Sequence, residues 1–335
     1  MSLPSILVTG ASGNLGKKII LKLHDLKKFK IIGLDIRPDK NLQNLIEFLN
    51  IDISKLENLS KNFKNIDLIC HCASLIDSPL YNESDYKNTN VLGTENIYSI
   101  AQKENIGKVV LTSSTSVMEM DKKNEKWPIY ENYVGEPNNI YGRSKKDQEL
   151  IAKKYSVNHN IQTICLRPCS FFHLDNPELG FRLTGSYAIL DDIANAHVAA
   201  IETLLNDEKI KNIKKFESIF VTNKLPYKNG DQKLFGRKGE MKDLVLKYWP
   251  TKSKFIFDLG YKKTVFSGVY DLEKAKNILN WEPKYNYDDW YNDCKKQNLN
   301  FNEEKKRYRE KKSILNKVLK IFKNLSKSIL YNTKS

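Results

Sequence analysis

Residues 6–16 read ILVTGASGNLG, an apolar run followed by three glycines at a fixed spacing. The run at 6–8 predicts a buried parallel strand, and the residues after it predict a tight turn that opens into a helix at Asn14 and Leu15. Glycines let a backbone turn touch a pyrophosphate, and the free N–H groups of a helix N-terminus attract anions. The glycines that carry this prediction are Gly10, Gly13 and Gly16. We therefore expect a dinucleotide to bind at this turn.

A carboxylate ends the next predicted strand, at residues 30–35. Asp35 lies about 20 residues beyond the glycine turn, where dinucleotide-binding chains place an acid that accepts hydrogen bonds from the adenosine ribose. This carboxylate would repel the 2′-phosphate of NADP. Arg37, two residues farther on, could instead pair with that phosphate. We predict NAD as the cofactor and keep NADP as the alternative.

Composition indicates a globular chain with a sizeable core, because 40% of its 335 residues are hydrophobic. The five cysteines are an odd number and lack the turn spacing of metal ligands. We therefore expect free thiols, a reducing cytoplasmic compartment and no metal site. The sequence shows neither a cleavable leader nor an apolar stretch of about 18 residues, so we expect a chain that is not secreted and does not span a membrane.

The net charge of +15 is concentrated at the C-terminus. Residues 301–335 contain eleven Lys and Arg against three Glu, which is more than half of the excess. From residue 314 apolar side chains fall on one face of a predicted amphipathic helix and lysines on the other. This tail can pack on the protein or a partner subunit, lie on an anionic membrane surface, or remain solvated. Without an aromatic and basic platform, the charge does not predict a nucleic-acid partner.

Apolar runs alternate with helical patterns through the first half of the chain. This rhythm predicts βαβ units and an α/β fold, a doubly wound parallel sheet of the Rossmann type. A later helix is expected from about residue 191 to 205. The predicted strands after the first two are residues 47–51, 67–72, 108–111 and 162–166.

We expect the chain to have three regions. Residues 1–167 are predicted to form the NAD(P)-binding domain. Residues 168–300 are predicted to form a smaller substrate-binding lobe, from which residues 190–222 return to the core. Residues 301–335 form the basic amphipathic tail.

A serine, a tyrosine and a lysine are spaced for proton and hydride chemistry. Ser114 follows the predicted strand at 108–111, and Tyr141 lies 27 residues farther on. Lys145, four residues after Tyr141, shares one face of a predicted helix with it. An ammonium beside a phenol lowers the pKa of the phenol from about 10, so that it can exchange protons near neutrality, while Ser114 can hold a reacting oxygen. We predict Ser114, Tyr141 and Lys145 as catalytic residues.

This ordered set of motifs makes the chain resemble an extended short-chain dehydrogenase/reductase over roughly residues 5–290. That family includes nucleotide-sugar epimerases, dehydratases and sugar dehydrogenases. Further markers are His71, Arg167-Pro168, Asp191-Asp192 and Trp281-Glu282-Pro283. Besides the glycine turn and the helix start, the resemblance implies these cofactor contacts: Asp35, Asp52, Ile53, Ala73, Ser74, Asn90, Ser113, Tyr141, Lys145 and Pro168.

In that family the tyrosine is the general acid and base, the lysine holds the nicotinamide ribose, and the serine positions the reacting oxygen. The resemblance gives these roles to Tyr141, Lys145 and Ser114. It also implies a sugar or nucleotide-sugar substrate and a homodimer. His71 is expected to pack the core rather than to catalyse, and the pair Asp191-Asp192 to cap a helix and pack the sheet.

Two departures from the family pattern narrow the reaction. Related 4,6-dehydratases place Asp and Glu directly after the catalytic hydroxyl residue, whereas this chain has Thr115 and Ser116, which disfavours dehydration. The segment from Pro168 to Asp191 is short and resembles that of some sugar-acid dehydrogenases. We predict a nucleotide-sugar epimerase-like enzyme, with a sugar or sugar-acid dehydrogenase or reductase as the alternative. A catalytically silent dinucleotide-binding sensor or scaffold is the remaining hypothesis.

Overall fold

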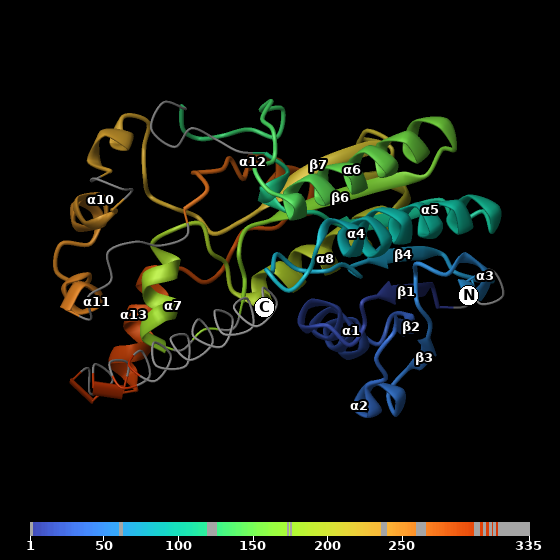
Figure 1. Cartoon of the computed structure of the whole chain (residues 1–335), viewed down its shortest axis with the longest axis horizontal. Helices are drawn as coiled ribbons and strands as arrows, with labels where there is room; N and C mark the ends of the chain where they lie inside the picture. Colours follow the sequence, from blue (N-terminus) through green and yellow to red (C-terminus); the bar gives the residue numbers. More distant parts are fainter. Residues whose placement is uncertain are drawn as a thin grey trace, which may run out of the picture. The chain divides into compact units, whose positions relative to one another are not determined.

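A parallel sheet organises the chain, as a computed structural model shows (Figure 1). The structure describes residues 3–59, 63–118, 126–172, 174, 176–235, 240–258, 266–297, 302, 303, 306, 307, 310 and 313. In this part of the chain the strand order is β3-β2-β1-β4-β5-β6-β7, and every neighbouring pair is parallel. The strands are β1 (Ser5–Thr9), β2 (Lys30–Asp35), β3 (Glu47–Asn50), β4 (Leu68–His71), β5 (Lys108–Thr112), β6 (Gln162–Pro168) and β7 (Phe216–Val221).

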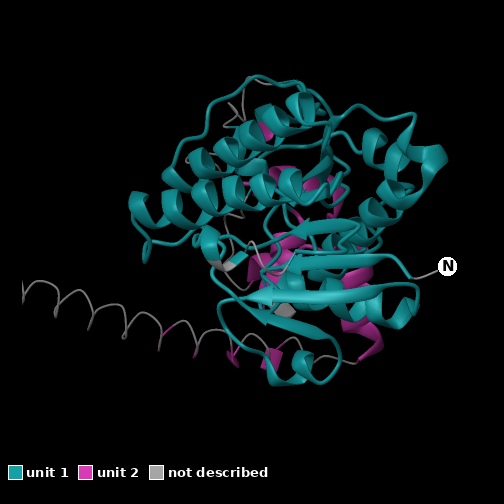
Figure 2. Ribbon diagram, turned by 90° about the vertical axis from the view of Figure 1, so that its right-hand side faces the viewer, with its two compact units in different colours: residues 1–173, 185–233, 265–286 teal, residues 174–184, 234–264, 287–335 magenta. Residues whose placement is uncertain are grey.

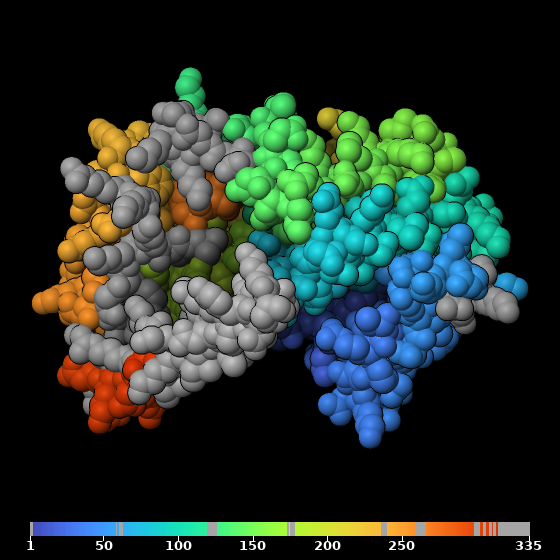
Figure 3. All heavy atoms as spheres, in the orientation of Figure 1, coloured from blue at the N-terminus to red at the C-terminus, as the bar shows by residue number. Residues whose placement is uncertain are grey.

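Helices cover both faces of this sheet (Figure 1). On one face lie α1 (Asn14–Leu26) and α8 (Leu190–Leu205), and on the other lie α5 (Gly93–Lys103) and α6 (Ile140–Asn158). Figure 3 shows α5 and α6 as a continuous teal and green surface along one side of the molecule. Shorter helices connect these elements: α2 (Lys40–Gln43), α3 (Leu56–Leu59), α4 (Glu83–Tyr86), α9 (Asp207–Ile210) and α12 (Glu273–Leu279).

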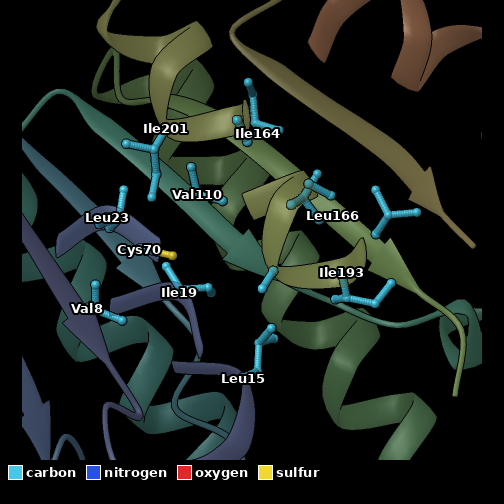
Figure 4. Close-up of a cluster of buried hydrophobic side chains, with 14 of the residues drawn as sticks. Val8, Leu15, Ile19, Leu23, Cys70, Val110, Ile164, Leu166, Ile193 and Ile201 are labelled. Atoms are coloured by element: carbon cyan, nitrogen blue, oxygen red, sulfur yellow. The ribbon is translucent and has the colours of Figure 1, made fainter. Parts of the chain in front are cut away.

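Side chains that alternate along the strands fill a core on each face. In β1, Ile6 and Val8 belong to the core beneath α1 and α8, whereas Leu7 belongs to the core beneath α5 and α6. Since both faces are covered, the strands read as unbroken apolar runs. Figure 4 shows the first core, in which α1 contributes Leu15, Ile19 and Leu23, α8 contributes Ile193 and Ile201, and the strands contribute Val8, Cys70, Val110, Ile164 and Leu166.

The chain divides into two compact units, and both are built from separated segments (Figure 2). Unit 1 comprises residues 1–173, 185–233 and 265–286 and contains the sheet. Unit 2 comprises residues 174–184, 234–264 and 287–335. Its helices are α7 (Asn176–Leu183), α10 (Lys242–Tyr248), α11 (Lys254–Asp258) and α13 (Tyr287–Lys296).

Unit 2 has a small aromatic core of its own. The ring of Trp290 packs so closely on α7 that a Cβ at Gly180 would come within 2.4 Å of it. Tyr287 lies beside Trp290, and Trp249 packs on Tyr287 with ring centroids 4.9 Å apart. The Trp249 indole N–H also donates to Asp288 at 3.1 Å. These contacts hold α7, α10 and α13 together.

The structure confirms the predicted Rossmann-type α/β fold and all of the named strands, with ends that differ by at most two residues. The five cysteines are free, as expected. The division into a cofactor domain ending at residue 167 and a substrate lobe stays a prediction, because it concerns what each part binds. The predicted amphipathic helix from residue 314 lies outside the described residues.

Candidate functional site

The carboxyl ends of the described strands collect at one edge of the sheet because these strands are all parallel. β1 pairs with β2 on one side and with β4 on the other, so the chain changes direction across the sheet at this point. In open α/β sheets, ligands bind in the crevice outside such a switch point. The glycine turn follows β1 directly and therefore lies at this position.

The glycine turn is packed so tightly that side chains are excluded. Gly10 has a φ of +69°, and a Cβ there would lie 2.8 Å from the backbone nitrogen of Ala73. A Cβ on Gly16 would lie 2.2 Å from the Gly10 carbonyl oxygen. Helix α1 begins at Asn14 with Gly13 as a cap that offers no side-chain hydrogen bond, and no acidic residue stands in its first turn. The open helix N-terminus and the bare turn fit a pyrophosphate.

Asp35 ends β2 beside this turn and is 7% exposed. Its Oδ2 accepts the backbone N–H of Ser12 at 3.1 Å, and its Oδ1 accepts that of Arg37 at 2.9 Å. The carboxylate is thereby held in one orientation at the glycine turn. The Arg37 side chain is 73% exposed, and its Nε lies 3.9 Å from Asp35. This arrangement fits the ribose of an adenine dinucleotide.

Loops after the neighbouring strands bring the other predicted cofactor contacts to the same edge. Asp52 and Ile53 follow β3, Ala73 and Ser74 follow β4, and Pro168 is the last residue of β6. The Ile53 side chain is buried, so it serves packing as well as any cofactor contact. Whether each of these residues touches the dinucleotide stays a prediction.

Asn90 connects two elements of the site. It lies in a turn of π-helix, Lys87–Leu92, and is fully buried. Its Oδ1 accepts the Leu75 N–H at 2.7 Å, and its Nδ2 donates to the Ser144 hydroxyl at 2.9 Å. Asn90 therefore ties the loop after β4 to α6.

Ser114, Tyr141 and Lys145 come together at the end of β5. Ser114 caps the 3-10 turn Thr115–Val117. Tyr141 and Lys145 lie in the first two turns of α6, and Ser114 is close enough to Tyr141 to act on the pKa of its phenol. The Lys145 Nζ lies 5.9 Å from the centroid of the Tyr141 ring and donates to the Thr112 carbonyl at 3.0 Å. The three residues predicted from their spacing are thus neighbours in the structure.

The pKa of Tyr141 differs from the prediction, and the pKa of Lys145 is also shifted. Burial raises the pKa of Tyr141 to about 12, against the opposing hydrogen bond from Ser114. Burial also lowers the pKa of Lys145 to about 8. The predicted lowering of the phenol pKa is wrong for the chain alone, because the ammonium is bound to Thr112 and both groups are removed from water.

His71 is a neutral connector in the core, as predicted. It is 1% exposed, and burial lowers its pKa to about 3. The Thr94 hydroxyl donates to the Asn90 carbonyl, so at 2.9 Å it accepts from Nε2 of His71. Nδ1 of His71 then accepts from the Thr9 hydroxyl at 2.7 Å. These bonds join β1 and β4 to the start of α5.

Asp191 and Asp192 do not cap α8, which corrects the prediction. The helix has no side-chain capping bond. Asp191 instead pairs with Lys18 and Lys22 of α1, at 2.9 and 3.0 Å. Asp192 accepts two backbone N–H groups from the segment that follows Trp281, both at 3.0 Å. The two carboxylates fasten α8 to its neighbours.

One buried ion pair beside the site was not predicted. Glu149 of α6 binds Arg167 of β6 through two hydrogen bonds, and it also accepts from Ser113. In the sequence, Arg167 is only a marker of the resemblance. Glu149 could have been found from its spacing, since it lies one helical turn after Lys145 on the same face.

In the part of the chain that the structure describes, no group of three or more His, Cys, Asp or Glu side chains is placed to hold a metal ion.

Among the described helices, none combines the length and the apolar character needed to cross a membrane.

Residues 6–178 match the NAD dependent epimerase/dehydratase family, and the chain belongs to that family. The decarboxylating sterol-4-alpha-carboxylate 3-dehydrogenase of Candida albicans is 26% identical over 320 residues, which covers 84% of this chain and 85% of that protein. The UDP-glucose 4-epimerase of Pisum sativum is 30% identical over 166 residues, or 44% of this chain and 46% of that protein. The crystal structure of a UDP-galactose 4-epimerase shares the fold, with a TM-score of 0.62, 17% identity and coverage of 86% and 96%.

Proposed function

We propose that the chain is an NAD-dependent sugar-modifying enzyme of the nucleotide-sugar epimerase type. The observation that supports this most is that Ser114, Tyr141 and Lys145 lie together at the end of β5, at the same edge of the sheet as the glycine turn. Proton transfer to or from a substrate hydroxyl needs a side chain that can accept and donate the proton, such as the Tyr141 phenol. The substrate oxygen must also be held within hydrogen-bond distance of that side chain. Asp35 at the end of β2 favours NAD over NADP.

Each residue has a role in this proposal. NAD, when bound, supplies the acceptor and donor of hydride. Tyr141 carries the proton of the reacting hydroxyl, and Ser114 orients that oxygen. Lys145, one helical turn from the phenol, would hold the nicotinamide ribose of the cofactor. An epimerase of this kind returns the hydride to the opposite face of the sugar carbon, so it shows no net turnover of the cofactor.

A dehydrogenase or reductase with net cofactor turnover is the second candidate. It is supported by the relative from Candida albicans, named as a dehydrogenase, which aligns with most of the chain. The short segment between Pro168 and Asp191 also leaves little chain for a nucleotide-binding insertion. Dehydration remains disfavoured by Thr115 and Ser116, which are not acids.

A substrate screen separates these candidates. Purified protein with NAD is incubated with nucleotide sugars, free sugar acids and hydroxysteroids, while NADH absorbance and epimer formation are followed in parallel. A new epimer without net NADH supports the epimerase, and net NADH supports the dehydrogenase. Cofactor binding without turnover of any substrate class would favour the silent sensor or scaffold.

Tyr141→Phe tests the mechanism. The substitution removes the hydroxyl that carries the proton, so we expect turnover to fall by about 10²–10⁴-fold. The dissociation constant for NAD, measured by calorimetry, should change little because the ring remains. Wild-type turnover in this variant would overturn the proposed roles.

We further propose a homodimer and a contact of the basic tail with anionic membrane surfaces. Support for the tail contact is the amphipathic pattern from residue 314 and its positive charge. Analytical ultracentrifugation of the purified protein tests the dimer.

Sedimentation with anionic vesicles tests the tail contact. A variant that lacks residues 301–335 should no longer sediment with the vesicles.

A further inference from the structure

A buried ion pair joins three elements behind the predicted catalytic residues. Glu149 and Arg167 are each 8% exposed. The guanidinium donates from Nε to Oε1 at 2.9 Å and from Nη2 to Oε2 at 2.7 Å, so the contact is bidentate. The Ser113 hydroxyl donates to Oε1 at 2.5 Å. One carboxylate of α6 therefore holds both β6 and the end of β5.

Other contacts leave Arg167 little freedom. Its Nη1 donates to the Glu131 carbonyl at 3.1 Å, and the guanidinium lies 5.7 Å from the centroid of the Phe220 ring. A planar guanidinium held in this way imposes its own orientation on the carboxylate that it binds. The position of Glu149 is thus determined by β6 and by the Glu131 loop, as well as by α6.

Both the ion pair and the serine bound to it lie next to predicted catalytic residues along the chain. Ser113 directly precedes Ser114, and Glu149 follows Lys145 by one helical turn. We propose that Glu149 is a positioning residue, which sets the placement of Ser114 and Lys145 through its bonds to Ser113 and Arg167. This inference rests on the proposed function, since it assigns a role in the same chemistry.

Glu149 also acts on Lys145 through its charge. The titratable groups that interact electrostatically with Lys145 are His71 of β4, Cys72 of the following loop, Cys165 of β6 and Glu149 of its own helix, on which the Tyr141 ring also lies 5.9 Å away. Burial lowers the pKa of Lys145, and Glu149 is among the groups that oppose this. Loss of the carboxylate should therefore lower the pKa of Lys145 further, so that less of it is charged near neutrality.

Glu149→Gln tests the proposal, with Glu217→Gln as the matched control. Glu217 is another buried carboxylate in an ion pair, 2.6 Å from Lys274, but it lies on β7. Carbon-13 NMR of protein labelled at lysine Cε follows the titration of Lys145, whose signal is identified by its loss in Lys145→Arg. We expect the midpoint of Lys145 to fall in Glu149→Gln and to stay unchanged in Glu217→Gln. We also expect kcat to fall roughly 10- to 100-fold, with a smaller change in KM, in Glu149→Gln only.

A double variant separates positioning from folding. Glu149→Gln leaves the Arg167 charge unpaired in the interior and can unfold the protein, whereas Glu149→Gln combined with Arg167→Gln removes both charges. We expect the double variant to fold but to keep the lowered midpoint of Lys145 and the reduced kcat. A wild-type midpoint and kcat in the double variant would show that the pair is only structural. If Tyr141→Phe is fully active, the proposed function fails. If Tyr141→Phe is inactive while Glu149→Gln matches the wild type, only this inference fails.

Discussion

Lys145 is a cation placed where water does not reach, which costs stability. Its side chain is 2% exposed and has the Thr112 carbonyl as a hydrogen-bond acceptor. The pKa of the folded state, about 8, lies below the ordinary value of 10.5. The unfolded chain therefore binds the proton more tightly than the native protein does. The cost is fully present below pH 8 and is relieved as the pH rises toward 10.5.

Lys145→Met should consequently stabilise the protein while inactivating it. A shift of this size corresponds to about 3 kcal/mol, from which about 1 kcal/mol is subtracted for the lost hydrogen bond. We expect the free energy of unfolding in urea at pH 7 to rise by about 1–3 kcal/mol. The gain should shrink at pH 10, where the wild-type lysine is already neutral in the folded state. A variant less stable than the wild type at pH 7 would contradict this.

Among the elements, the turn between β1 and α1 shows how a backbone path restricts sequence. The Gly16 Cα faces the Gly10 carbonyl within the first turn of α1, and the Gly10 Cα faces the backbone of Ala73. These are contacts between main chains, so a rotamer change cannot relieve an added methyl group. The same closeness keeps the helix N-terminus open to a phosphate.

Gly16→Ala should therefore damage both stability and cofactor binding. The new Cβ forces the turn apart, at a cost of about 1–3 kcal/mol, and moves the N–H groups that would bind the pyrophosphate of the proposed cofactor. Differential scanning calorimetry and NAD titration measure the two effects. Gly107→Ala is the matched control, because a Cβ there meets no atom within 4 Å. If the two variants have the same thermal stability and the same affinity for NAD, the turn accommodates a Cβ at Gly16 without damage.

Elements with a strong local signal were predictable from the sequence, and those that depend on distant contacts were not. The apolar runs of β1 and β4 and the glycine spacing predicted the sheet and the turn. β7 is not among the predicted strands, because Lys-rich and Asn-rich residues surround it, yet it pairs with β6 along its length. The bond from Glu149 to Arg167 spans 18 residues and needs both side chains to meet. The raised pKa of Tyr141 follows from burial, which local spacing does not reveal.

At the scale of the molecule, two buried histidines in the described part of the chain tie stability to pH. Burial lowers the pKa of His71 to about 3 and that of His197 to about 4, and both side chains are hydrogen-bonded in the core. In the unfolded chain both titrate near 6.5. The native state therefore resists protonation that the unfolded state accepts, and stability falls as the pH drops below 6.5.

We expect the free energy of unfolding to fall by several kcal/mol between pH 6.5 and 4, at about 1.4 kcal/mol per pH unit for each histidine. Urea unfolding monitored by circular dichroism measures this slope. His197→Gln should make the slope shallower, whereas His24→Gln, at an exposed position of α1, should not change it. If His197→Gln keeps the wild-type slope, groups other than His197 cause the loss of stability at acid pH.

The interleaving of the two units has a consequence for biosynthesis. Segments of unit 1 are followed by segments of unit 2 and then again by unit 1, so a ribosome releases neither unit complete before residue 286. Domains usually fold one after another as they emerge. Until this stretch is made, Asp192 of α8 lacks the two N–H groups that it binds after Trp281, and α7 lacks its contact with Trp290. A nascent chain stalled before this point would expose the apolar faces of both units and would depend on chaperones for protection.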